Sequence, residues 1–171
     1  MSTTGETITE AGPALLEREA LSALPVEHLF DMGVELEPVQ LIPTAIGTVL
    51  NYVAKGGTVE GPRIKGEVLP GGGDGLVVGT DQVGRVGVRA TLRTDDGVLI
   101  HYTAGGVIKI PADGLQRLEA GERLPFEETY VRTTPVLETN DERYSWLSES
   151  VLVGLNELSQ NHIDYRVYRV R

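Results

Sequence analysis

Asp74 is the residue that stands out first for acid–base chemistry. It lies in the stretch GEVLPGGGDG, residues 66–75, directly after three consecutive glycines. A carboxylate at such a bend can be an ordinary turn residue that hydrogen-bonds its own backbone. It can equally be a general acid or base placed at the mouth of a binding site. The sequence leaves both readings open, and Asp74 is the first candidate catalytic residue.

The glycines beside Asp74 do not form a phosphate-binding loop. A P-loop needs Lys-Ser or Lys-Thr after its glycines and a helix behind them, and GGGDGLVVG has neither. A dinucleotide-binding motif also needs the N-terminus of a helix to receive the phosphates. We therefore predict a tight bend, in which glycines adopt positive φ angles or let another strand approach closely.

Arg89 lies in the clearest hairpin pattern, GRVGVRATLRTDDGVLIHYTAGG, where alternating residues flank an Asp-Gly turn. A two-residue turn places Arg89 on the same strand face as Tyr102. That face is either solvated or the lumen of a barrel, where an arginine can bind a carboxylate or an enolate with its planar guanidinium group. In the second case Arg89 is catalytic and Tyr102 contacts the substrate.

A third group of candidates lies in YVRTTPVLETNDERYSWL. Arg132 and Glu138 either form a structural ion pair or converge on a mostly apolar pocket. In the pocket reading Glu138 is catalytic, and Arg132, Tyr144 and Trp146 bind the substrate. Trp146 is the only tryptophan, and packing in the core explains it as well.

Other kinds of site have little support. The chain has no cysteine, which excludes disulfides and thiolate chemistry. Its histidines, His28, His101 and His162, do not lie at metal-ligand spacing. No serine occupies a nucleophile elbow, and no cofactor-binding motif is visible. We therefore expect a site without metal or cofactor, which works by proton transfer and positioning.

The charge of the chain narrows its partners. A formal net charge of −10 disfavours nucleic acids and anionic membranes. No apolar run is long enough to span a bilayer, and the first residues lack the basic start and apolar core of a secretory signal. These features predict a soluble cytoplasmic protein, and the candidate site residues predict that its partner is a small organic molecule.

Strands must position these residues. The 21 glycines and few aromatic residues fit many turns between short strands. We predict an all-β domain over residues 26–171, with about eight strands and a short helical turn in PADGLQRLEAGE. Such a run of strands is typical of a closed barrel or a sandwich and argues against a Rossmann fold. Residues 1–25 are predicted to be a flexible tail or a short peripheral helix that Pro25 ends.

Four motifs in a fixed order resemble those of a known family. They are GGTVEGPRIKGEVLPGGGDG, VRATLRTDDGVLIHY, YVRTTPVLETNDERYSWL and the closing VLVGL…VYRV. Together they resemble the family known as domain of unknown function 3237, over roughly residues 26–171. The resemblance implies a single closed, calycin-like β-barrel, often a homodimer or a higher homo-oligomer. It also implies a cofactor-free enzyme or a binding protein of small-molecule metabolism.

The resemblance also marks recurring polar positions and one departure. The recurring positions correspond to Asp74, Arg89, Asp96, Arg132, Glu138, Tyr144 and Trp146. Family members often carry an acid two residues before the strand arginine, where this chain has Gly87. If that acid assists the arginine in catalysis, this protein works differently. If that acid only forms a surface ion pair in the family, its replacement by Gly87 does not affect the function.

Three functions follow from these residues. The first is a cofactor-free isomerase, cyclase or lyase/hydratase that acts on an organic acid or a carbonyl compound in the barrel lumen. It requires a lumenal carboxylate with a perturbed pKa within reach of an arginine. The second is a lipocalin-like binding protein, whose lumen holds aliphatic residues and arginines. The third is a structural, oligomeric barrel without a cavity large enough for a ligand.

Overall fold

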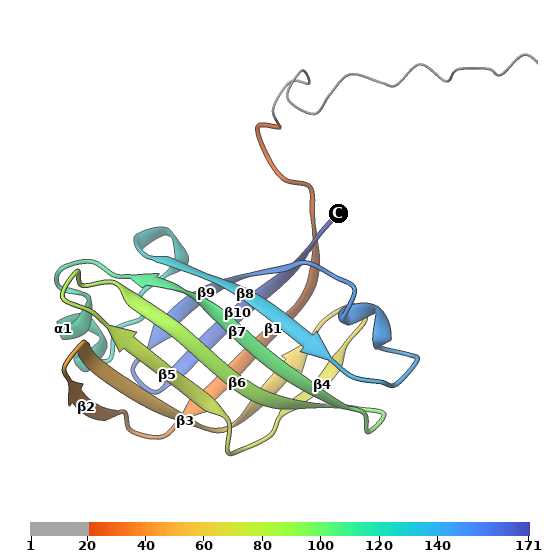
Figure 1. The fold of residues 1–171 in the computed structure, drawn as a ribbon, viewed down its shortest axis with the longest axis horizontal. Helices are drawn as coiled ribbons and strands as arrows, with labels where there is room; N and C mark the ends of the chain where they lie inside the picture. The colour runs from red at the N-terminus through yellow and green to blue at the C-terminus, as the bar shows by residue number, and fades with distance from the viewer. Residues whose placement is uncertain (1–20) are drawn as a thin grey trace, which may run out of the picture.

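Nearly all the regular structure is β-strand in the computed structural model, which describes residues 21–171 (Figure 1). The strands are β1 (Val26–Leu36), β2 (Gln40–Thr44), β3 (Gly47–Glu60), β4 (Lys65–Val68), β5 (Gly73–Val78), β6 (Gly84–Thr94), β7 (Leu99–Lys109), β8 (Tyr130–Glu138), β9 (Leu152–Ser159) and β10 (His162–Val170). The first strand begins directly after Pro25, at the predicted start of the domain. Residues 1–20 of the predicted tail lie outside the described residues.

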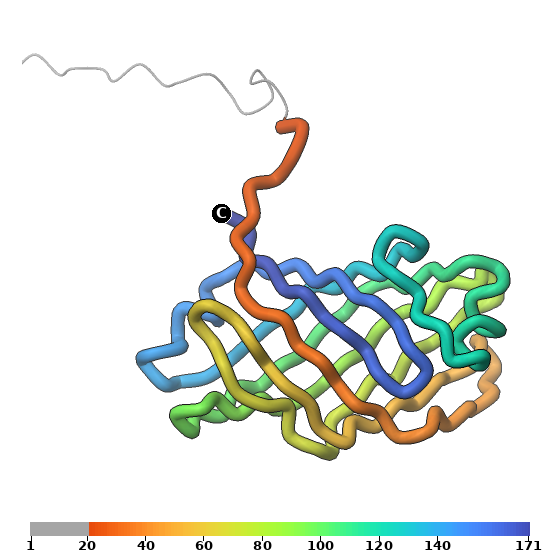
Figure 2. The backbone as a smooth tube through the Cα atoms, turned by 180° about the vertical axis from the view of Figure 1, so that it is seen from behind, coloured from red at the N-terminus to blue at the C-terminus, as the bar shows by residue number. Residues whose placement is uncertain are grey.

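The sheet closes on itself because β1 pairs with both β10 and β3. The wall runs β1-β10-β9-β8-β7-β6, then through β4 and β5, which share one position, and back through β3. It therefore has eight positions, and every pairing is antiparallel. The predicted closed barrel is confirmed, and the tube view shows the strands wrapping around one axis (Figure 2). Strand β2 pairs with the first half of β3, on the edge that β1 occupies further along β3.

Aliphatic and aromatic side chains fill the barrel because alternate residues of each strand point inward. Phe30, Leu92, Ile100 and Tyr102 are fully buried in the main cluster. A smaller cluster joins Leu124, from the connection between β7 and β8, to Val131 on β8 and Leu158 on β9.

Three short helices lie in the connections after β7 and β8. They are α1 (Gly114–Glu119), within the predicted helical turn, and the 3-10 turns Phe126–Glu128 and Ser145–Leu147. None of the helices in the described part of the chain is long and apolar enough to cross a membrane.

The β6–β7 hairpin differs from the sequence prediction by one turn residue. Three residues, 95–97, connect Thr94 to Val98, and Gly97 has a φ of 89°. The extra residue shifts the register, so that Ala90 and not Arg89 lies on the same rung as Tyr102. Because a shift of one residue moves a side chain to the other face, the predicted shared face of Arg89 and Tyr102 is wrong.

Candidate functional site

Asp74 lies inside the barrel, beyond the glycine-rich bend. It is the second residue of β5, opposite Tyr52 on β3 and Val88 on β6. Asp74 is 7% exposed, and its Oδ1 accepts a hydrogen bond of 2.8 Å from the Gly87 backbone N–H. Within residues 21–171 no arginine, lysine or histidine forms an ion pair with it. Asp74 is therefore a carboxyl group in the barrel lumen and not an ordinary turn residue.

Glycines allow β5 to place Asp74 there. Gly71 has a φ of 97°, which other residues rarely adopt. A Cβ on Gly72 would lie 2.6 Å from the Arg89 carbonyl oxygen, and one on Gly73 would clash with the Tyr52 carbonyl oxygen. The predicted bend, with a positive φ and close backbone approach, is confirmed.

Burial changes the acidity of Asp74. It raises the pKa of this carboxyl group to about 6, and the hydrogen bond from Gly87 only partly offsets the effect. A carboxyl group with a pKa near neutrality can accept a proton and return it at physiological pH. Asp74 therefore has the acidity that a general acid–base catalyst needs.

Three tyrosines accompany Asp74 inside the barrel: Tyr52 on β3, Tyr102 on β7 and Tyr165 on β10. Burial, with a smaller effect of the Asp74 charge, raises the pKa of each hydroxyl group, so all three remain protonated donors. The Tyr102 hydroxyl is fully buried and finds no hydrogen-bond partner in the described part of the chain. Leaving such a donor unpaired costs about 1–3 kcal/mol. The Tyr102 hydroxyl is therefore a lumenal donor with free capacity for a hydrogen bond.

A cavity of about 20 Å³ lies next to Asp74. Its wall is mostly aliphatic, and the polar side chains in it are Tyr52, Asp74 and Tyr165. A water molecule needs roughly 10–15 Å³ by the same measure. The lumen in this state therefore has room for about one water molecule beside the carboxyl group.

The two predicted arginines lie on the outer face of the barrel. Arg89 is exposed on β6, one residue from inward-facing Ala90. Arg132 on β8 places its guanidinium carbon 4.3 Å from the centre of the Phe126 ring and donates to the Val131 carbonyl oxygen at 2.9 Å. The alternation of strand residues turns both side chains away from Asp74. The structure therefore does not bring either arginine together with the lumenal carboxyl group.

Glu138 is also outside the lumen. It is exposed at the end of β8, where its Oε2 lies 3.5 Å from Nδ1 of His101 on β7. The sequence left open whether Glu138 forms a structural ion pair with Arg132. Glu138 does form a surface pair, but its partner is His101. Of the two candidate acid–base residues, Asp74 and Glu138, only Asp74 is buried.

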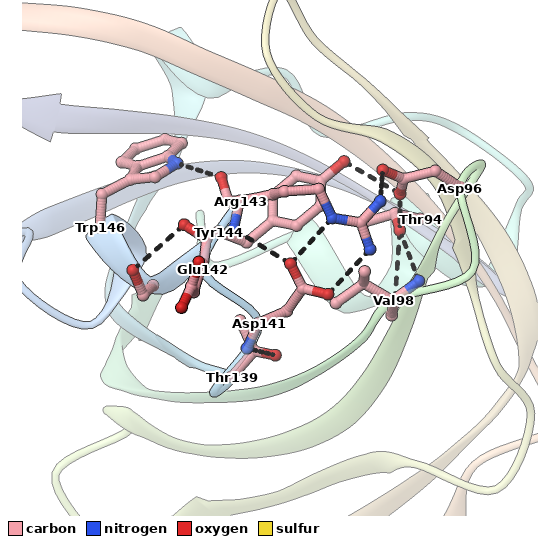
Figure 3. Close-up of polar contacts among 10 residues, drawn as sticks. Thr94, Asp96, Val98, Thr139, Asp141, Glu142, Arg143, Tyr144 and Trp146 are labelled. Carbon is pink, nitrogen blue, oxygen red and sulfur yellow. Dashed lines mark hydrogen bonds and ion pairs between the residues drawn. The ribbon is translucent and has the colours of Figure 1, made fainter.

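Tyr144 and Trp146 belong to a polar cluster at the end of the barrel away from α1 (Figures 1 and 3). Asp96, in the β6–β7 turn, accepts hydrogen bonds from Thr94 Oγ1 at 2.5 Å, Arg143 Nη1 at 2.7 Å and the Tyr144 hydroxyl at 3.1 Å. These contacts tie the hairpin tip to the connection between β8 and β9. Tyr144 therefore stabilises this end of the barrel and does not face Asp74.

Trp146 completes the same end. Its indole N–H donates to the Arg143 carbonyl oxygen at 3.2 Å (Figure 3). The guanidinium carbon of Arg63 lies 3.7 Å from the ring centre, a cation–π contact. Trp146 is half-buried and packs against the main cluster, which agrees with the core-packing interpretation.

Gly87 answers the question raised by the family resemblance. It is exposed, and a Cβ added there would come no closer than 3.7 Å to any atom, the Gly75 carbonyl oxygen. Its side-chain position lies on the outer face with Arg85 and Arg89. An acid at this position would therefore lie on the surface, and glycine there leaves the lumen unchanged.

Tyr52 and Tyr165 were missed at the sequence level. Tyr52 meets Asp74 through the pairing of β3 with β5, and Tyr165 comes from β10 at the other end of the chain. In NYVA, Tyr52 lies two residues before Ala54, and in IDYRV, Tyr165 lies two residues from Ile163 and Val167. Each tyrosine therefore lies on the same strand face as a hydrophobic residue. That signal marks them as inward-facing residues, but only the long-range pairing places them beside Asp74.

The fold and its interior define a small closed β-barrel with a buried carboxyl group in the lumen. The chain belongs to the family described as Protein of unknown function (DUF3237), whose family model matches residues 24–170. A UPF0311 protein from Rhodopseudomonas palustris strain TIE-1 is 32% identical over 99 residues. The matched segment covers 58% of this chain and 65% of that relative, slightly less than two thirds of its length.

Solved structures share the barrel. A conserved protein of unknown function from Rhodopseudomonas palustris has a TM-score of 0.82 at 25% identity, over 88% of this chain and 100% of that chain. A protein from Penicillium herquei described as an enzyme has a TM-score of 0.66 at 18% identity, over 90% of this chain and 99% of that chain. At this identity the second likeness concerns the fold alone.

Proposed function

We propose that this protein is a cofactor-free enzyme that transfers a proton on a neutral carbonyl compound, with Asp74 as general base and general acid. One observation carries the proposal: a buried carboxyl group without a cationic partner in the described residues shares a lumen with the unpaired hydroxyl of Tyr102. Buried groups of this kind cost stability and cluster at functional sites.

The proposed reaction uses these two groups in sequence. The Asp74 carboxylate takes a proton from the carbon next to the carbonyl group. The C–H electron pair forms a C=C bond, and the electron pair of the C=O π bond moves onto the oxygen to give an enolate. Tyr102 donates a hydrogen bond to that oxygen in a site with little water, where such a donor is most effective. As the carbonyl group re-forms, protonated Asp74 gives the proton to the γ-carbon of a β,γ-unsaturated ketone, which moves the double bond, or to a β-hydroxyl group, which leaves as water with the electron pair of its C–O bond.

The lumen favours a neutral substrate over an organic acid. The sequence-based hypothesis used Arg89 and Arg132 to bind a substrate carboxylate, and both side chains lie outside the barrel. A substrate anion would lie near ionised Asp74 without a neighbouring cation, an arrangement that costs free energy in a low-dielectric interior. We therefore restrict the proposed substrates to neutral ketones, enones and related carbonyl compounds.

Proton exchange at carbon tests this proposal with simple carbonyl compounds in place of the natural substrate. A panel of neutral ketones and enones is incubated with the protein in D₂O, and NMR follows deuterium incorporation and double-bond migration. We expect Asp74→Asn to lower the rate by about 100-fold and Tyr102→Phe by at least about tenfold. The rate should rise through pH 6 as Asp74 ionises.

The controls are Arg89→Ala and Glu138→Gln, which change exposed residues and should leave the rate unchanged. Equal activity in Asp74→Asn and wild type would refute the assignment.

A structural role is the second candidate, and the small cavity favours it. A lumen with room for about one water molecule is the arrangement expected of a barrel that only folds and assembles. In that case no carbonyl compound of the panel exchanges faster with the protein than without it. The homodimer or higher oligomer implied by the family resemblance stays a prediction.

A further inference from the structure

We propose that the substrate reaches Asp74 along an apolar ramp, formed by Leu41 on β2, Leu50 and Tyr52 on β3, and Leu76 on β5. The ramp selects a neutral substrate with a sizeable apolar part. This inference rests on the proposed function and adds the access route and the substrate's character.

Strand register places the ramp residues on one face. Leu41 is paired with Leu50, and Leu50 with Leu76. Directly opposite residues project to the same side of a sheet, as do residues two apart on one strand. Tyr52 and Asp74 follow two residues after Leu50 and two residues before Leu76, and they are themselves paired. The ramp is therefore the lumenal face of the barrel, continued outward onto β2.

Exposure decreases across the ramp from β2 to β5. Leu41 is 63% exposed, Leu50 is half-buried and Leu76 is 6% exposed. Strand β2 pairs with β3 alone, at the end of the barrel where α1 lies (Figure 1). Tyr52, half-buried at the inner end, lines the cavity beside Asp74. A molecule resting on Leu41 and Leu50 could extend its reactive group past Tyr52 into the lumen.

The ramp carries no charge. Residues 39–54 include no Asp, Glu, Lys or Arg, although 23% of the chain is charged. On β5 the only ionisable side chain is Asp74 itself. An uncharged apolar surface that ends at a carboxyl group suits a neutral, apolar molecule, and both Asp74 and the net charge of −10 oppose an anion.

A small molecule fits this surface better than a second copy of the chain does. Strand β2 has only five residues, and Pro43 removes a backbone N–H that pairing with another strand would use. The unpaired Tyr102 hydroxyl in the lumen is a donor that a carbonyl oxygen would satisfy and that a protein partner on β2 would leave unpaired. The occupant we infer is therefore a neutral apolar carbonyl compound.

Two neighbouring substitutions on β2 test the ramp. Leu41 lies on the ramp and Ile42 on the opposite face of the same strand, and both are exposed, at 63% and 47%. The probe is prodan, a neutral naphthyl ketone whose emission shifts to the blue in apolar surroundings. Leu41→Glu should weaken prodan binding to the full chain by at least about tenfold, and Ile42→Glu by less than about twofold. Anilinonaphthalenesulfonate, an anion of similar size, should bind more weakly than prodan to the wild type.

Each outcome decides for or against the ramp. Equal effects of Leu41→Glu and Ile42→Glu, or no prodan binding, would overturn it. So would a wild-type dimer in sedimentation that Leu41→Glu dissociates without weakening prodan binding, because β2 would then bind a second copy. Asp74→Asn separates the two proposals. If this variant binds prodan and also exchanges protons at the wild-type rate, the acid–base function is refuted, whereas the binding surface is retained. Lost prodan binding in Leu41→Glu with wild-type circular dichroism supports the ramp.

Discussion

Asp74→Asn is expected to stabilise the protein at neutral pH and to leave it unchanged in acid. Burial raises the pKa of Asp74 from 3.8 in the unfolded chain to about 6 in the folded one. Between these values the folded state binds more protons than the unfolded state, so the wild type loses stability as the pH rises from about 4 to about 6. The shift corresponds to about 3 kcal/mol above pH 7. The neutral amide of asparagine removes this penalty.

Urea unfolding of both proteins between pH 3.5 and 8 (a range set by the two pKa values) measures the difference. The control is Asp141→Asn. Paired with Arg143, Asp141 has a pKa lowered to about 2, so its replacement should have the opposite sign and destabilise the protein at neutral pH. A difference between Asp74→Asn and wild type that does not change with pH would show that Asp74 is not buried as described.

Gly73→Ala is expected to destabilise the barrel by at least about 3 kcal/mol. The added Cβ would clash with the Tyr52 carbonyl oxygen, a backbone atom of β3 that cannot rotate away. Strand β5 would have to move away from β3, and Asp74 would move with it. Denaturant unfolding gives the change in stability, and the proton-exchange assay shows whether activity falls as well.

Gly75→Ala is the matched control for Gly73→Ala. Gly75 lies two residues further along β5, with a φ outside the positive range, and nothing lies within 4 Å of an added Cβ. Its replacement should change the stability by less than about 0.5 kcal/mol. If both substitutions cost the same, the close approach of β5 to β3 is wrong, and so is the position it gives Asp74.

Much of the fold could be predicted because it depends on local patterns. Alternating strands, frequent glycines and the family motifs indicate the closed barrel, and Pro25 marks its start. The faces of the β6–β7 hairpin could not be predicted in the same way. They depend on whether the turn has two residues or three, and TDDGV is compatible with both. The one additional turn residue places the Arg89 side chain on the opposite face of the hairpin from Tyr102.

The candidate site was predictable only in part. Asp74 was found because it lies directly after the glycine-rich bend, where a carboxylate can be either a turn residue or an acid or base. Its neighbours Tyr52 and Tyr165 depend on pairings between distant strands, which no local pattern specifies. The family resemblance marks Tyr144 and Trp146 as candidates for a site, yet they hold one end of the barrel together through Asp96, Arg143 and Arg63. Recurring polar residues can therefore serve the architecture as well as the chemistry.

Titration of the Asp74 carboxyl group is the measurement to make first. Carbon-13 NMR of the full chain, with Asp74→Asn to assign the resonance, follows its side-chain carbon between pH 3 and 8, a range that spans both pKa values. The proposal predicts a midpoint at about pH 6, together with a rise of proton-exchange activity over the same range. A midpoint near the ordinary value of 3.8 would contradict it, because an exposed or ion-paired carboxylate could not act as the lumenal acid and base.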